Sequence, residues 1–228
     1  MAPVLRAKLP EAETTCSQVM SPLSVFTSHS PLGFCSIAVT VVPISGAVEV
    51  APRLGLAEAM DTAQRGMGVD WATARELITR TMRAAKAHPL APRVACGAGT
   101  DHVALADLRD AAAIMAAYET QAEVIETAGG QLILMASRAF TAIGADHATY
   151  HTVYRHLIDG ARDPVVLHWL GDMFDPALAG YWGSHDVATA SDFVLRLIAE
   201  NPAKVDGIKI SLLDQAHEEA FRARLPKG

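Results

Sequence analysis

Short runs of apolar residues recur along this chain at regular intervals, and a segment with helical periodicity follows each of them. The runs start near Arg93, Gln131, Pro164 and Val205, about one strand and one helix apart, and residues 54–59 form an earlier run. Nearly continuous apolar runs of this length are typical of strands that are buried on both faces. The chain is therefore predicted to fold as serial βα units, in a closed (β/α)₈ barrel or an open doubly wound sheet.

The segments between these runs carry start and stop signals for helices. Asp70 is placed to cap a helix over Trp71–His88, and Pro89 would end it. Later helices are expected over Val103–Thr127, Tyr150–Gly160, Phe193–Ile198 and Leu213–Arg224. No GxGxxG motif follows a strand and no GxxxxGK[ST] motif occurs, so the dinucleotide and P-loop forms of the open sheet have no support.

The first part of the chain differs in composition from the rest. No Asp, Glu, Lys or Arg occurs from Ser21 to Val48, whereas charged residues and alanine are frequent after Arg53. We therefore expect a poorly ordered or loosely packed extension over residues 1–52 and the barrel domain over residues 53–228. Within the extension, only Ile37–Val42 has the pattern of a strand.

Charge and cysteine usage narrow the range of partners. The formal net charge is −6 and no basic run occurs, so nucleic acid is not expected as a partner. The apolar stretch over residues 32–48 contains Pro43 and is shorter than the roughly 20 residues of a membrane span, so no membrane association is expected. The three cysteines are scattered outside any CxxC motif, which fits the reducing cytoplasm. A small-molecule substrate is the expected partner.

One lysine interrupts an otherwise buried strand. In residues 205–211 (VDGIKIS), Lys209 lies between two isoleucines. Burial disfavours the charged ammonium and leaves an amine that can attack a carbonyl group, as in Schiff-base enzymes. A lysine at a strand end can also extend its amine to solvent, so its surroundings must decide between the two interpretations.

Polar residues gather where the predicted strands end, the usual location of active sites in such folds. They are Asp61 and Thr62, Asp101 and His102, Ser137 and Arg138, His168 with Asp172, and Lys209 with Ser211. Taken singly, Asp101 is expected to be a helix N-cap, and His168 fits equally well as a core histidine. Together they predict one polar site at the carboxyl-terminal ends of the strands.

Two mechanisms could use this polar site. In the first, Lys209 forms an imine with a keto acid, His168 transfers protons, and Arg138 or the backbone near Thr62 holds the carboxylate. In the second, a divalent metal bound by acidic and histidine side chains, among them Asp61 and Asp172, polarises a carbonyl group in a lyase or isomerase. The first is preferred because neither HxH nor HExxH occurs. It requires no metal and no cofactor.

Several motifs resemble one enzyme family. Gly207-Ile208-Lys209 on a late strand, the strand end Leu167-His168-Trp169, and Asp61-Thr62 on an early strand resemble the dihydrodipicolinate synthase and N-acetylneuraminate lyase group of class I aldolases. More specifically, residues 57–68 (AEAMDTAQRGMG), 96–101 (CGAGTD) and 168–174 (HWLGDMF) resemble a bacterial branch described as dihydrodipicolinate synthase family proteins. The resemblance implies a (β/α)₈ barrel, a Schiff-base lysine at Lys209 and a pyruvate-like carboxylate near Asp61 and Thr62.

The chain departs from that group in three ways. His168 stands where better-known members have a tyrosine, and Asp61 stands in the carboxylate loop, where it would repel a keto acid. Only about five to six βα units are visible, so the barrel is expected to be incomplete, with an open sheet in an apparently truncated chain. Unpaired edges of such a sheet favour association into a homo-oligomer, and a non-catalytic barrel fragment is the remaining alternative.

Overall fold

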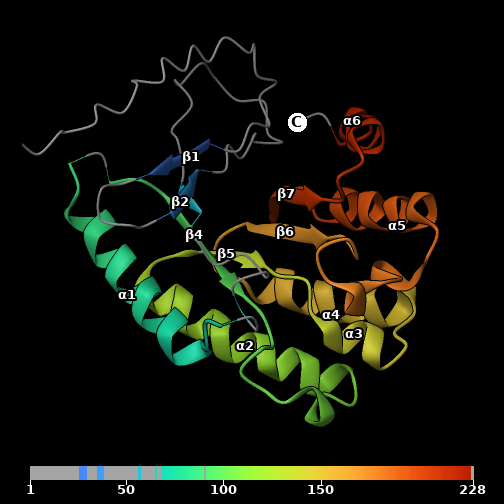
Figure 1. Ribbon diagram of the computed structural model, residues 1–228, viewed down its shortest axis with the longest axis horizontal. Helices are drawn as coiled ribbons and strands as arrows, with labels where there is room; N and C mark the ends of the chain where they lie inside the picture. Colours follow the sequence, from blue (N-terminus) through green and yellow to red (C-terminus); the bar gives the residue numbers. More distant parts are fainter. Residues whose placement is uncertain are drawn as a thin grey trace, which may run out of the picture.

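A computed structural model describes residues 26–29, 35–38, 56–57, 65, 68–89 and 91–226. Its seven strands form one sheet in which each strand pairs with the next along the chain (Figure 1). The strands are β1 (Phe26–His29), β2 (Cys35–Ala38), β3 (Leu56–Ala57), β4 (Val94–Ala98), β5 (Gln131–Leu134), β6 (Val165–Leu170) and β7 (Val205–Ser211). The first three pair in antiparallel fashion, and β3 to β7 are parallel.

The order of the parallel strands identifies the winding of the sheet. A doubly wound sheet reverses its strand order at a switch point, whereas a barrel adds each strand beside the previous one. Strands β3 to β7 follow one another without a reversal. The fold is therefore α/β of the (β/α)₈-barrel type, and the sheet is open, with β1 and β7 as the edge strands among the described residues.

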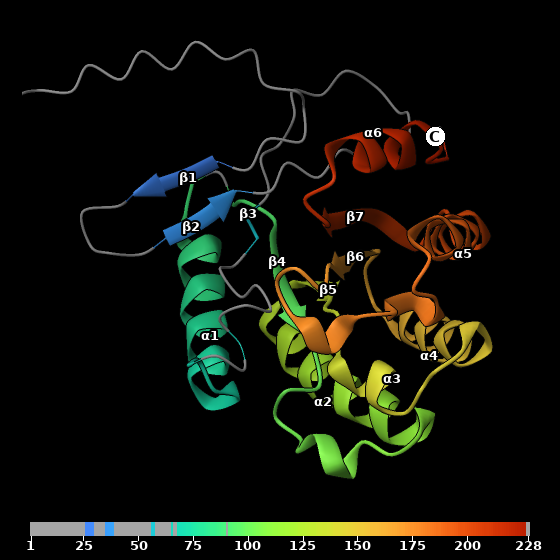
Figure 2. The same ribbon diagram turned by 45° about the vertical axis from the view of Figure 1, so that its right-hand side comes forward.

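Helices connect the strands, and most begin at an aspartate whose side chain accepts a backbone N–H of the first turn. They are α1 (Trp71–Ala87), α2 (Ala111–Ala128), α3 (Arg138–Ala142), α4 (His147–Gly160), α5 (Val187–Glu200) and α6 (Gln215–Ala223), with short 3₁₀ turns η1 (Leu105–Asp107), η2 (Pro176–Leu178) and η3 (Tyr181–Gly183). Figure 2 shows α1, α2, α4 and α5 arranged around the sheet. No helix of the described residues has the length and apolar content to cross a membrane.

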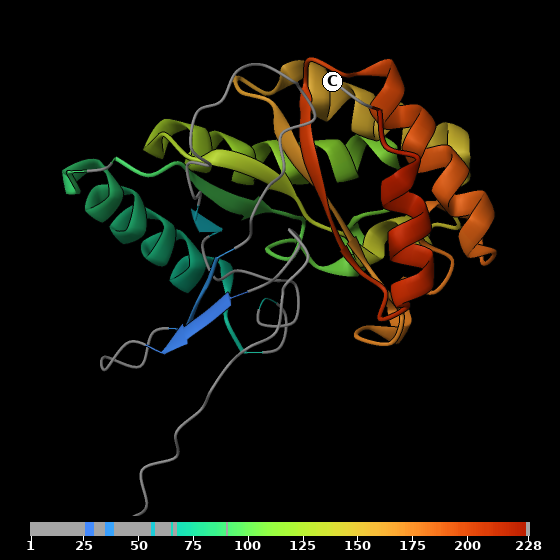
Figure 3. The same cartoon turned by 90° about the horizontal axis from the view of Figure 1, so that it is seen from above.

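The two faces of the sheet are occupied differently. Alternate strand residues such as Leu132 and Leu134 join the main core with the helices, while Ala95, Ile133 and Val166 form a smaller buried cluster on the opposite, inner face. Helix α6 packs beside α5 at the end of the chain (Figure 3). In a barrel-type sheet the active site lies at the carboxyl-terminal ends of the strands, where side chains of the inner face can reach it.

Several sequence-based expectations need correction. The helix expected from Val103 begins at Ala111, because residues 99–110 form a loop and Asp110, not Asp101, caps it. Strand β2 begins at Cys35, two residues before the expected strand Ile37–Val42, and no strand was expected at β1. Phe26 is the one apolar residue of β1 and β2 has only four residues, so neither segment alone shows that the two pair.

Candidate functional site

The Schiff-base lysine candidate and the candidate proton-transfer residue lie opposite each other on neighbouring strands. His168 of β6 is the register partner of Lys209 of β7, and both come from the carboxyl-terminal halves of their strands. Ile208 and Ile210 pack against the main core on the helix side, so Lys209 belongs to the inner face. Lys209 itself is half-buried.

His168 is almost fully buried, with 1% of its surface exposed. Burial, and in second place the positive charge of Lys209, lower the pKa of His168 to about 3. The imidazole is therefore neutral at physiological pH. This places a neutral, buried imidazole beside the half-buried Lys209.

A second polar cluster surrounds a buried arginine. The side chain of Arg65 is fully buried, and its guanidinium binds Asp101 in a bidentate pair, with N–O distances of 2.8 and 3.2 Å. It also donates to Gly97 O at the end of β4 and to Gln121 Oε1 of α2, and it stacks 5.1 Å from the centre of the Trp71 ring. Arg65 thus ties the segment before α1 to β4 and α2.

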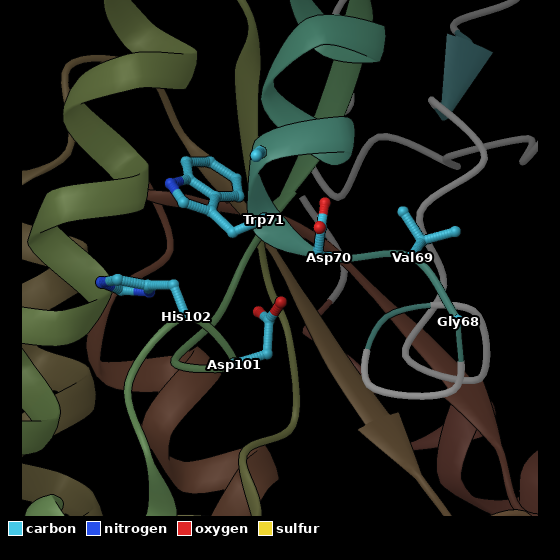
Figure 4. A pocket seen from close by; sticks show the side chains of 7 residues that line it. Gly68, Val69, Asp70, Trp71, Asp101 and His102 are labelled. Carbon is cyan, nitrogen blue, oxygen red and sulfur yellow. The ribbon is translucent and has the colours of Figure 1, made fainter.

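A pocket of about 610 Å³ opens beside this cluster, between the start of α1 and the loop after β4. Figure 4 shows its lining, Gly68, Val69, Asp70, Trp71, Ala72, Asp101 and His102. A volume of this size suits a small molecule. The lining contains two carboxylates and two aromatic rings but no arginine or lysine.

His102 has a defined tautomer in this pocket. Gln121 Oε1 accepts the N–H of Gly99 at 2.7 Å, so its amide nitrogen faces Nδ1 of His102, 2.9 Å away, and donates to it. The ring hydrogen of neutral His102 then lies on Nε2. Burial lowers the pKa of His102, with Asp101 opposing and Arg65 adding to this effect, which favours that neutral form.

Of the remaining predicted site residues, the structure describes Arg138 and Asp172. Arg138 follows β5 but donates to Asp175 Oδ2 at 2.6 Å, and Asp172 is exposed in the loop after β6. Asp61 and Thr62 lie outside the described residues. The substrate-binding roles of these four residues stay predictions.

Sequence reasoning missed Arg65 and Gln121. Gln121 carried a signal, since it is a glutamine within the apolar stripe of α2, between Tyr118 and Ile125. Arg65 carried none, because its burial depends on partners more than thirty residues away in sequence. His147, at the start of α4, stacks on Phe193 of α5 with the two ring centres 4.8 Å apart.

The described residues contain no group of three or more histidine, cysteine, aspartate or glutamate side chains that could hold a metal ion. The two polar clusters combine cationic, amide and imidazole groups with the carboxylate of Asp101.

Comparison with known families supplies one assignment. A family model described as "Protein of unknown function (DUF993)" matches residues 50–228, which is most of the chain. The chain belongs to this family. The description of DUF993 names no activity, so relationship to the class I aldolases is still a proposal. No curated protein matches the chain significantly.

Among solved structures, this DUF993 member is similar to dihydrodipicolinate synthase from Oceanobacillus iheyensis. The two share 12% sequence identity with a TM-score of 0.38, and the match covers 74% of this chain and 63% of that chain. The chain thus spans less than two thirds of that enzyme. A TM-score this low does not establish a common fold, so the assignment to the barrel type rests on the strand order of the sheet itself.

Proposed function

We propose that this protein is a lyase of the aldolase type, which binds a small keto acid or aldehyde through a Schiff base on Lys209. The observation that carries the proposal is the register pairing of Lys209 with the buried, neutral His168 on the inner face of a barrel-type sheet. A cytoplasmic enzyme without a metal or cofactor is part of the same proposal.

The chemistry follows from the charges of the pair. The unprotonated Lys209 amine attacks the carbonyl carbon, and the carbinolamine that forms loses its hydroxyl group as water to give the imine. One proton of the attacking nitrogen passes to the carbonyl oxygen, which gives the neutral carbinolamine, and His168 carries the remaining nitrogen proton to the hydroxyl group, which leaves as water. Burial, the main cause of the low pKa of His168, makes the protonated imidazole short-lived, and the uncharged nitrogen removes the second cause, the positive charge of Lys209.

The substrate's carboxylate, if it has one, needs a partner other than the two arginines described near the strand ends. Arg65 is enclosed by Asp101, Gly97 and Gln121, and Arg138 is paired with Asp175. Releasing Arg138 would leave the largely buried carboxylate of Asp175 without its partner, and releasing Arg65 would break its ion pair with Asp101, which is costly. Backbone N–H groups are the better candidates for this role within the proposal.

Reductive trapping tests the proposal directly. The protein is incubated with a panel of 2-keto acids and aldehydes, reduced with borohydride and digested, and the adduct is located by mass spectrometry. We expect a reduced secondary amine on Lys209, lost in Lys209→Arg and retained in Lys204→Arg. Lys204 is the matched control because its amine donates to Ala161 O, away from His168. An unmodified Lys209 with every carbonyl compound, or equal labelling of Lys204, would refute the proposal.

A further inference from the structure

The pairing of β6 with β7 changes register before it reaches the lysine. Val165 pairs with Val205, but the next residue of β6, Val166, pairs with Gly207. Asp206 is therefore an extra residue in β7, which makes this a β-bulge. Bulges of this kind often redirect a side chain near an active site.

This bulge decides which face of the sheet Lys209 occupies. Side chains alternate along a strand, and Val205 is buried in the core on the helix side. With strict alternation, Lys209 would share that side with Val205 and would pair with Trp169. The extra residue shifts the alternation by one, so Lys209 pairs with His168 on the inner face instead.

The extra residue is anchored to the neighbouring strands by its side chain. Gln131 at the start of β5 donates through Nε2 to Asp206 Oδ2 at 2.9 Å and to Pro164 O at 2.7 Å. Arg93, just before β4, lies 3.5 Å from the same carboxylate oxygen. The amide of Gln131 thus bridges the amino-terminal ends of β6 and β7, where the bulge lies. Gly207 has no side chain to crowd Asp206.

We propose that Asp206 is a positioning residue, which, held by Gln131, maintains the bulge that turns Lys209 toward His168. The importance of Asp206 for catalysis rests on the proposed function. The face of the sheet that Lys209 occupies follows from the strand register alone. Asp206 lies at the opposite end of β7 from the reacting groups and acts only through the backbone.

The test measures the environment of Lys209 without any substrate. Competitive labelling with acetic anhydride, read by mass spectrometry, gives the reactivity of Lys209 relative to the other lysines of the chain. We compare Asp206→Ala, Asp206→Asn, Gln131→Met and Asp192→Ala. The asparagine keeps an oxygen that can accept from Gln131, and Asp192→Ala removes an exposed carboxylate that pairs with Arg224 on another part of the molecule.

We expect the relative reactivity of Lys209 to change by roughly fivefold in Asp206→Ala and Gln131→Met. The loss of one ordinary hydrogen bond shifts the equilibrium between the bulged and the regular register by about that ratio. Asp206→Asn and Asp192→Ala should match the wild type. A merely stabilising role would lower the melting temperature and leave this ratio unchanged, which would refute the inference. If Asp206→Ala does not fold, Gln131→Met decides alone. Absence of a trapped adduct in the wild type would refute the proposed function only, since labelling needs no imine.

Discussion

The pair of the buried Arg65 and the partly exposed Asp101 allows a quantitative test of what organises the pocket. Replacing Arg65 with methionine removes both bonds to Asp101, the donors to Gly97 O and Gln121 Oε1, and the stacking on Trp71. Removing one partner of a buried ion pair costs about 3 to 5 kcal/mol. Because 22% of the Asp101 side chain is exposed, water can reach the carboxylate that remains, so we expect about 3 kcal/mol for Arg65→Met.

The reverse change should cost more. Asp101→Asn leaves a fully buried guanidinium, which cannot lose its proton in a protein. We therefore expect about 4 kcal/mol for Asp101→Asn, and a double variant whose loss is about 2 kcal/mol smaller than the sum of the single losses. Urea unfolding followed by circular dichroism, with tryptophan fluorescence as a second probe, measures all three free energies of unfolding. If each variant loses less than about 1 kcal/mol, or if the two losses add, the Arg65–Asp101 pair does not hold the segment before α1 to β4 and α2.

Three further outcomes are expected. Folding lowers the pKa of His168, so the stability that the neutral histidine contributes is present above pH 6.5, about the unfolded pKa, and is lost as the pH falls toward 3. His168→Leu should therefore reduce the slope of the unfolding free energy against pH, between pH 6 and 4, by about 1.4 kcal/mol per pH unit. An unchanged slope in urea unfolding at several pH values would contradict this prediction. Gly130→Ala should lower the melting temperature, because the new Cβ would lie 2.9 Å from Cγ2 of Ile125, at a cost of about 1 to 3 kcal/mol; calorimetry showing no loss would contradict this contact. Deletion of residues 1–52, which removes β1 and β2, should change the melting temperature little because the described pairing of β2 with β3 is the single pair Ile37–Ala57, and a large loss would show that these two strands stabilise the core sheet.

Local signals in the sequence determined the elements of the fold and their order. Asp70 followed by an apolar periodicity is enough to place α1, and continuous apolar runs are enough to place β4 to β6, because capping and burial act over a few neighbouring residues. Strands of only four and two residues, such as β1 and β3, carry little periodic signal, which is why β1 was missed.

Tertiary structure alone decided the parts of the site that depend on distant partners. Arg65 is buried only because Asp101 and Gln121, on a different loop and helix, converge on its guanidinium. The inner-face position of Lys209 likewise depends on the bulge at Asp206, since strict alternation from Val205 would have turned the lysine toward the helices. A strand's own sequence sets only the alternation of its side chains. The register against the neighbouring strand decides which face each side chain occupies, and that register is set by contacts across the sheet.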